Sequence, residues 1–398
     1  MVSQAIDGSP AEHTVILECQ LGATPSRAPP PPMPHHREFP SMATYTTLDR
    51  ENFRTSVDGK PVDLFTLRNR RGAEVRVTNY GAKIEQVLVP DRDGTLGDVA
   101  LGYATIDQAM NGQPSMGSFI GRYCGRIGGG RFVLDGVEHR TTVNAPPHTL
   151  HGGTRGSRFR VFDARQLDES SLELTYVFQD GEEGFPGTLP VRLVYTLDDA
   201  NALTIAWAAV AADRTTVVNF TDHTFFNLSG LGGTSILDHV ATVQASRYLA
   251  LDETAVPTGA IMDVTGTPFD FRAPSAFGAR IAADHPMLVL GGGYDLHYVA
   301  EKPAGAFGLH ARVEHPGSGR TLEVWSTEPG LQLYTGNFLE GKAPRDLGKG
   351  GTLYTRHSAF CLEPSHFPNA VNLPDFPSTV LKAGQWHTGR IVYGFGVA

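Results

Sequence analysis

The sequence predicts an all-β protein whose strands are mainly antiparallel and close into a large sandwich. The chain holds 45 glycines and 27 prolines in 398 residues, a composition that favours turns and short strands over long helices. Apolar and polar residues alternate in several runs, as they do in half-buried strands. These runs follow one another without the helical crossovers that parallel strands require. With 40% hydrophobic residues, the chain is long enough to bury a large core.

The first strand signals are two β-rich runs at residues 74–77 and 84–89, separated by Asn79-Tyr80-Gly81. Residues 91–94, Asp-Arg-Asp-Gly, predict a turn after the second run. Residues 172–178 and 191–197 alternate as strands do. The segment 198–201 then joins the second of these to residues 203–207, which predicts a hairpin.

Residues 1–41 differ from the rest of the chain. They lack periodicity and contain four consecutive prolines, Pro29 to Pro32, which fix backbone angles and remove hydrogen-bond donors. We therefore expect a disordered leader, or an extension that the natural product lacks, followed by a single domain over residues 42–398. An intact native mass that begins at Met1 or Val2 would contradict the second version.

Charge and cysteine content exclude several classes of protein. A formal net charge of −9 argues against a nucleic-acid partner, which would require a basic surface. Three cysteines without a CxxC pair favour reduced thiols over a disulfide framework.

The longest apolar run, residues 202–212, is about half of a membrane span, and no secretory signal precedes it. We expect a cytoplasmic protein without a membrane partner; its oligomeric state is left open.

Two motif-like features have simpler explanations. His148 and His151 have the spacing of a metal-binding pair, but they lack the helix and the glutamate of a metalloprotease motif. The glycines that follow His151 are typical of a loop that approaches a ligand closely. The glycine runs 128–130 and 291–293 match no phosphate-binding pattern and are predicted to be turns.

One histidine and one glutamate are better candidates for chemistry. His223 lies in an aromatic, β-branched segment, where a histidine alone is more often structural. Glu363 lies in an apolar segment directly before Pro364. A carboxylate in such a segment is costly unless it is paired or functional. Together the two residues are candidates for a functional site.

From about residue 44 onward, the chain resembles the aldose 1-epimerase (galactose mutarotase) family. The motifs that carry the resemblance occur in the family's order: GRYCGRI at 121–127, LHGG at 150–153, HTFFNL at 223–228, GYD at 293–295, LQLYTGNF at 331–338 and LEPSHFPNAVN at 362–372. The resemblance implies a large β-supersandwich with a cleft on one concave face. It also implies that His223 is the general acid and Glu363 the general base, with Arg126, His151, Asp295 and Gln332 holding the sugar.

The implied reaction interconverts the α and β anomers of a free aldose such as galactose or glucose, and it needs neither a metal nor a cofactor. A base removes the proton of the anomeric hydroxyl while an acid protonates the ring oxygen. We expect Glu363 to be ionised and His223 protonated, with each charge favouring the other. Because strand residues alternate, Thr221, His223 and Phe225 should face the site and Asp222 should face away.

The chain departs from the family pattern at two positions. The family usually has asparagine where this chain has Gly125, so an amide contact to a sugar hydroxyl should be missing. Phe225 stands where a tyrosine is usual; it keeps an aromatic face for the substrate and loses the phenol. Both departures concern sugar preference more than the reaction.

Three alternatives remain from the sequence. A relative that acts on hexose 6-phosphates would need a cationic phosphate pocket, and the matched motifs contain only Arg122 and Arg126 as a close pair. A sugar-binding sandwich without catalysis is compatible with the fold. A glycoside hydrolase would use two carboxylates, for which Asp295 and Glu363 are available.

Overall fold

The computed structural model describes residues 45–230 and 232–398. The predicted leader, residues 1–41, and Cys19 lie outside the described residues, and the single domain over residues 42–398 stays a prediction. In the described part, nearly all regular structure is β-strand and every named strand pairing is antiparallel, as predicted. No helix in that part is long and apolar enough to cross a membrane.

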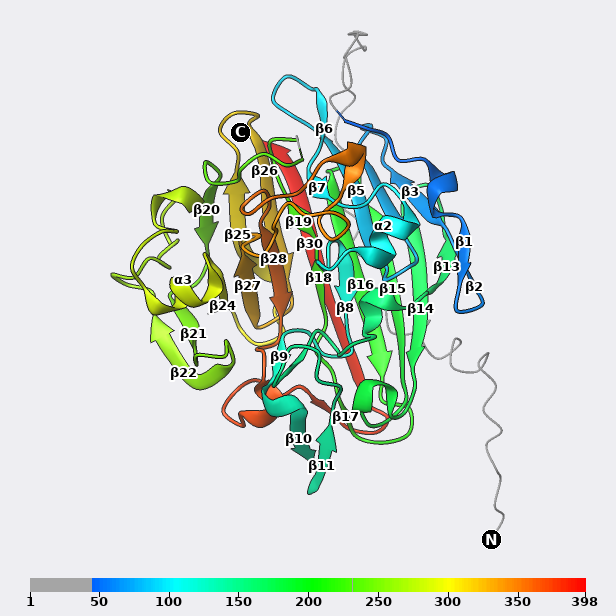
Figure 1. Ribbon diagram of the computed structural model, residues 1–398, viewed down its shortest axis with the longest axis vertical. Coiled ribbons are helices and arrows are strands. Elements are labelled where there is room, and N and C mark those ends of the chain that lie inside the picture. The colour runs from blue at the N-terminus through cyan, green and yellow to red at the C-terminus, as the bar shows by residue number, and fades with distance from the viewer. Residues whose placement is uncertain (1–44, 231) are drawn as a thin grey trace.

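The largest sheet has nine strands and crosses the whole molecule (Figure 1). Its strands in spatial order are β13 (Asp163–Gln166), β14 (Ser171–Phe178), β15 (Leu189–Leu197), β16 (Ala202–Val210), β30 (Trp386–Val397), β26 (Arg320–Ser326), β25 (Gly308–Glu314), β20 (Val240–Val243) and β23 (Ser275–Ala276). The predicted hairpin is the β15–β16 pair, with Leu197 opposite Leu203.

Two smaller sheets accompany it. The five-stranded sheet has the order β22 (Pro257–Asp263), β21 (Arg247–Leu251), β24 (Asp295–Val299), β27 (Gly330–Tyr334) and β28 (Cys361–Ser365). The four-stranded sheet has the order β3 (Leu64–Arg68), β4 (Glu74–Thr78), β5 (Lys83–Pro90) and β6 (Leu96–Asp98), where β4 and β5 are the first two predicted strands.

Short strand pairs and helices complete the described part. The pairs are β1 (Thr55–Val57) with β2 (Lys60–Val62), β10 (Arg131–Leu134) with β11 (Val137–Arg140), β9 (Arg126–Ile127) with β12 (Thr149–Leu150), β17 (Thr216–Val217) with β29 (Val380–Leu381), β8 (Ser118–Ile120) with β18 (Thr221–His223), and β7 (Ala100–Leu101) with β19 (Phe225–Phe226). The helices are α2 (Ile106–Asn111) and α3 (Pro286–Gly291), with 3₁₀ turns η1 (Arg50–Phe53), η2 (Gly128–Gly130), η3 (Ser157–Phe159), η4 (Glu182–Gly184), η5 (Phe277–Ala279), η6 (Lys349–Gly351) and η7 (Ala370–Asn372).

One hydrophobic core joins the three larger sheets. It contains Trp207 and Ile391 from the nine-stranded sheet, Leu331 and Leu362 from the five-stranded sheet, and Ile84 from the four-stranded sheet, all at most 1% exposed. Leu331 and Leu333 of β27 point into this core, so Gln332 between them points to the opposite face. That opposite face of the five-stranded sheet carries the candidate site.

Candidate active site

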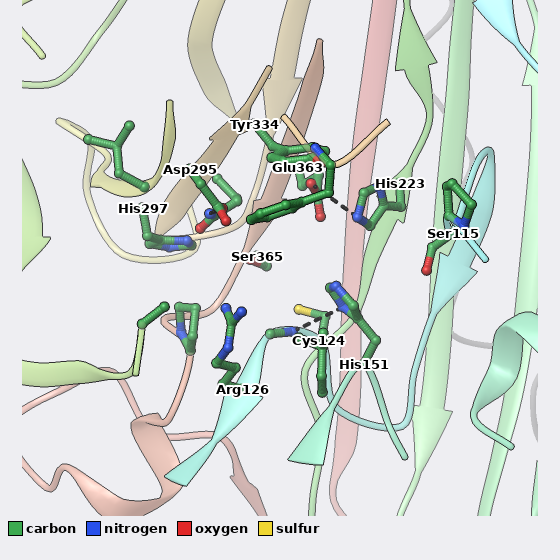
Figure 2. Close-up of a pocket in the computed structure, with 18 of the residues that line it drawn as sticks. Ser115, Cys124, Arg126, His151, His223, Asp295, His297, Tyr334, Glu363 and Ser365 are labelled. Atoms are coloured by element: carbon green, nitrogen blue, oxygen red, sulfur yellow. Dashed lines mark hydrogen bonds and ion pairs between the residues drawn. The ribbon is translucent and has the colours of Figure 1, made fainter. Parts of the chain in front are cut away.

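A cavity of about 290 Å³ brings together all seven residues that the sequence predicted for the site. The predicted catalytic residues His223 and Glu363 line it, together with Arg126, His151, Phe225, Asp295 and Gln332. In Figure 2, Arg126, Cys124 and His151 approach from one side, and Asp295, His297, Tyr334 and Glu363 from the other. The volume and the polar lining suit a small polar ligand.

Strand register explains one wall of the cavity. In the five-stranded sheet His297 pairs with Gln332 and Gln332 with Glu363, so the three side chains form a row across β24, β27 and β28. Asp295 and Tyr334 pair in the next row. Side chains two residues apart on a strand share a face. One face of three short strands therefore supplies many of the polar groups.

Glu363 lies on an edge strand. β28 is the last strand of its sheet, so the Pro364 nitrogen needs no partner on the outer side. Glu363 is 4% exposed, and burial raises the pKa of its carboxyl well above the ordinary value, with Asp295 and Asp222 raising it further. Burial therefore favours the protonated form of Glu363.

His223 ends β18 and faces Glu363. Its Nε2 lies 3.6 Å from Oε1 of Glu363 (Figure 2), and its ring stacks on Phe225 with centroids 5.1 Å apart. Burial lowers the pKa of His223 to about 4. Burial thus favours the neutral form of both residues, which opposes the ionised pair that the sequence led us to expect.

His151 forms an edge contact with His223, with ring centroids 5.2 Å apart. Its Nδ1 accepts a hydrogen bond from the Gly125 backbone N–H at 3.3 Å, so the neutral ring carries its proton on Nε2. Burial, followed by the neighbouring His223, lowers the pKa of His151 well below the ordinary value. His151 can therefore donate one hydrogen bond without carrying charge.

The predicted hydroxyl-binding residues form a second polar group. The Gln332 side-chain amide donates to Asp295 Oδ1 at 2.6 Å, which fixes both side chains. Burial raises the pKa of Asp295, and the nearby Arg126 guanidinium opposes that shift. Carboxylate, amide and guanidinium groups held side by side are suited to binding vicinal hydroxyls.

The alternation argument for the His223 strand is largely supported. Asp222 points away from the cavity, where its Oδ1 accepts hydrogen bonds from Thr224 Oγ1 at 2.6 Å and from the Tyr393 hydroxyl at 3.1 Å. Phe225 lines the cavity as expected. Thr221 is buried but is not part of the lining, and its hydroxyl donates to the Asp222 carbonyl at 3.4 Å.

Sequence reasoning missed several lining residues. His297 and Tyr334 lie two positions after Asp295 and Gln332, so strand alternation could have found them. Arg158 and Arg345 come from distant loops and carried no sequence signal. Both arginines already have protein partners: Arg158 donates to Ser115 Oγ at 2.8 Å, and Arg345 pairs with Glu340 at 2.6 Å.

The departure at Gly125 has a structural counterpart. Its φ is +72°, and a Cβ added there would lie 2.8 Å from Cβ of Pro368. Pro368, which also lines the cavity, thus fills the space into which a side chain at position 125 would project. The second member of the close arginine pair, Arg122, is buried, and its guanidinium donates to the carbonyls of Pro186 and Gly187.

Comparison with known proteins identifies the family. A model of the aldose 1-epimerase family matches residues 63–394. The chain belongs to the aldose 1-epimerase family. It is 41% identical to galactose mutarotase of Sus scrofa over 337 residues, which cover 85% of this chain and 95% of that protein. It is 30% identical to aldose 1-epimerase of Escherichia coli over 340 residues, covering 85% and 96%.

The fold agrees with this assignment. A solved structure of an aldose epimerase homologue from C. elegans superposes with a TM-score of 0.77 at 28% identity, covering 85% of this chain and 99% of that one. A galactose 1-epimerase from Lactobacillus acidophilus superposes with a TM-score of 0.76 at 26% identity, covering 86% and 97%. The predicted β-supersandwich is therefore confirmed.

Proposed function

We propose that the cavity interconverts the α and β anomers of a free aldose, with Glu363 as general base and His223 as general acid. The reaction class is that of the family to which the chain belongs, and it makes the protein an isomerase. The observation that supports the two roles is the 3.6 Å separation of His223 Nε2 and Glu363 Oε1 on one cavity wall. The two oxygens that must exchange protons are bonded to the same anomeric carbon, so an acid and a base this close can serve both.

Ring opening begins with the ion-pair form of the two residues. The Glu363 carboxylate takes the proton of the anomeric hydroxyl, and the His223 Nε2–H gives its proton to the ring oxygen. The C1–O5 bond then breaks and the aldehyde forms. Glu363 is now protonated and His223 neutral, which are the forms that burial favours.

Ring closure reverses the roles after rotation about the C1–C2 bond. Protonated Glu363 returns its proton to the carbonyl oxygen while neutral His223 takes the proton of the C5 hydroxyl. The pair shares one proton throughout, so the cycle needs no exchange with solvent. Hydroxyls of the bound sugar that donate to the Glu363 carboxylate stabilise the ion-pair form against the effect of burial.

The remaining predicted residues bind the sugar in this proposal. Asp295 accepts hydrogen bonds from ring hydroxyls and Arg126 donates to them. The Gln332 side-chain amide can do either. His151 donates one further bond from Nε2. Phe225, stacked on the acid, holds the His223 ring in place and offers an apolar surface to the sugar.

The location in the cell is a separate proposal. Cys124 and Cys361 are buried free thiols, which supports a reducing compartment and hence the cytoplasm. Fractionation of the native host with an antibody against the chain tests it. Recovery of the protein outside the cytoplasmic fraction would contradict it.

Polarimetry tests the catalytic roles. Freshly dissolved α-D-galactose or α-D-glucose should reach rotational equilibrium faster with the wild-type protein than in buffer alone. Glu363→Gln and His223→Asn should each lower kcat by about 10²–10⁴-fold. His151→Asn, the matched control at a neighbouring imidazole, should keep appreciable turnover and raise KM.

Two results would overturn the proposal. Near-normal turnover of Glu363→Gln would remove the general base. Saturable galactose binding to the wild-type protein without faster anomer exchange would favour the sugar-binding alternative.

A further inference from the structure

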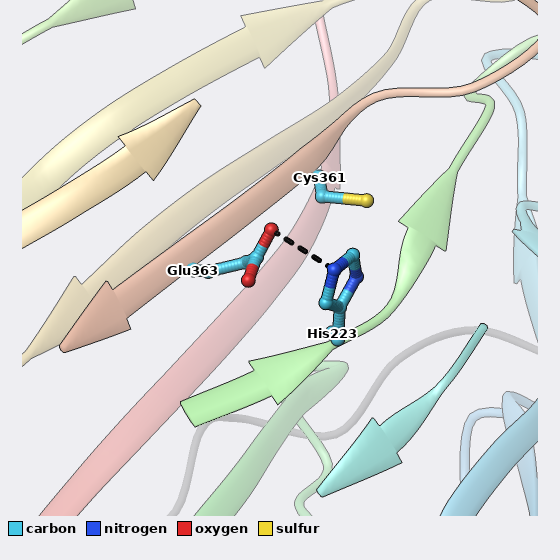
Figure 3. Close-up of side chains that lie close together, drawn as sticks. All are labelled: His223, Cys361 and Glu363. Carbon is cyan, nitrogen blue, oxygen red and sulfur yellow. Dashed lines mark ion pairs between the residues drawn. The ribbon is translucent and has the colours of Figure 1, made fainter. Parts of the chain in front are cut away.

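The thiol of Cys361 lies close to the proposed acid–base pair, His223 and Glu363. His223, Cys361 and Glu363 each offer one ligand atom, and these atoms all lie within 4.8 Å of one another (Figure 3). Cys361 and Glu363 are two residues apart on β28, so their side chains share a face, and His223 enters from β18. Cys361 is fully buried and is not part of the cavity lining.

The spacing of the three atoms suits a tetrahedral ion. Zinc binds imidazole nitrogen and carboxylate oxygen at about 2.0–2.2 Å, so two such ligands lie about 3.3–3.5 Å apart in a tetrahedral site. His223 Nε2 and Glu363 Oε1 are 3.6 Å apart without an ion. An inward movement of the Cys361 sulfur would complete three positions. Because His223 and Glu363 line the cavity, a fourth ligand can come from that side.

The outer nitrogen of His223 is compatible with metal binding. A neutral imidazole bound to metal through Nε2 carries its proton on Nδ1. Nδ1 of His223 is buried and has no hydrogen-bond partner among the described residues, so no donor opposes a proton there.

We propose that His223, Cys361 and Glu363 form an inhibitory site for a borderline-soft divalent cation of the zinc type. On binding, the Cys361 thiol and the Glu363 carboxyl each lose a proton to the solvent as the sulfur–metal and oxygen–metal bonds form, and neutral His223 binds through Nε2. The ion then occupies the atoms that the anomeric oxygens of the sugar would use, so it competes with the sugar. It is not a cofactor, and the inhibitory effect, unlike the binding itself, rests on the proposed function.

A second cluster provides the contrast. Ligand atoms of Asp238, His239 and His315 also lie within 4.8 Å of one another. However, His239 Nε2 accepts from the Leu228 N–H at 3.0 Å, and His315 Nδ1 accepts from the Ser318 N–H at 3.0 Å. These donors place the ring protons on the nitrogens that face Asp238, which is where a metal would have to bind. This cluster serves as a control.

Binding is measured on the full-length chain, freed of any affinity tag and of metal. Co²⁺ titration should give the thiolate-to-metal charge-transfer absorption that only a sulfur ligand produces. Zn²⁺ should displace Co²⁺, and saturating galactose should weaken both. Cys361→Ser and Cys361→Ala should abolish the absorption, whereas Cys124→Ser, the matched change at a buried thiol of the cavity wall, and Asp238→Asn should keep it.

Inhibition is measured by polarimetry, relative to the zinc-free rate of each variant. The two Cys361 variants should raise the zinc concentration for half-inhibition by at least about 10-fold, because even the loss of a partner that only orients a metal ligand costs this much. Unfolding midpoints verify that each variant is folded, and the alanine variant replaces the serine variant if the latter is not. A wild-type protein without the charge-transfer absorption would overturn the site, as would inhibition that Asp238→Asn removes and Cys361→Ala leaves intact. Because the absorption is independent of turnover, a failure of the proposed function would leave the binding result interpretable.

Discussion

His223 and Glu363 illustrate how burial and chemistry oppose each other at a single pair of residues. Burial lowers the pKa of His223 to about 4 and raises that of Glu363 well above its ordinary value. With one proton between them, the pair can be an ion pair or two neutral groups, and the proposed reaction alternates between these forms. The cycle should stop when the pair gains a second proton or loses the one that it shares.

This gives a prediction for the pH dependence of kcat/KM. His223 stays neutral until the pH falls to about 4, so the acid limb, where the pair gains a second proton, should lie near pH 4 and not near the ordinary histidine value. On the alkaline side, the rate should fall as Glu363 loses the shared proton. Polarimetry at constant ionic strength from pH 3.5 to 9 measures both limbs. An acid limb near pH 6.5 would contradict the burial argument.

The sequence predicted residues that the structure brings together in one cavity, but it did not predict how burial affects their protonation. Each of the seven predicted residues lies in one of the matched motifs, and all seven line one cavity. Strand alternation correctly placed Asp222 away from the cavity and, had it been applied to Asp295 and Gln332, would have found His297 and Tyr334. Desolvation depends on what covers a residue in three dimensions. The effect of burial on His223 and Glu363 could therefore not be predicted from the sequence around each residue.

At the scale of elements, a contact between two loops limits which side chain position 125 can hold. The loop before β9 carries Gly125, and the loop after β28 carries Pro368, which would lie 2.8 Å from an added Cβ. The sequence predicted a missing amide at position 125. It could not predict that a proline from a segment more than two hundred residues away takes its space.

Gly125→Asn should therefore destabilise the protein without improving sugar binding. Asparagine tolerates positive φ better than most residues, so the main cost is crowding against Pro368, about 1–3 kcal/mol. Gly94→Asn is the matched control, because Gly94 has φ +82° and open space around its Cβ position. Urea unfolding should show a much smaller loss there. In Gly125→Asn/Pro368→Gly, which removes the Pro368 Cβ, part of the loss should be recovered, and strict additivity would contradict the contact.

At the scale of the whole molecule, Asp222 links the active-site strand to the large sheet. It is fully buried, and its Oδ1 accepts from Tyr393 of β30 at 3.1 Å, while Oδ2 has no partner among the described residues. Burial raises the pKa of Asp222 from 3.8 to about 7. Burial therefore favours the neutral, protonated form of the Asp222 carboxyl, which lies between β18 and the nine-stranded sheet.

The global stability should consequently depend on pH through Asp222. The folded protein holds this proton more tightly than the unfolded chain, so the contribution is complete below about pH 4 and is lost as the pH rises through about 7. Asparagine cannot ionise, and it keeps an acceptor for Tyr393. The unfolding free energy of the wild type relative to Asp222→Asn should fall by about 2–3 kcal/mol between pH 5 and pH 8. Asp93→Asn, in the exposed turn after β5, should show no such trend in urea unfolding at the two pH values. If the wild-type and Asp222→Asn values change in parallel, the buried carboxyl is already ionised at pH 5, and the large sheet holds a charge next to the active-site strand.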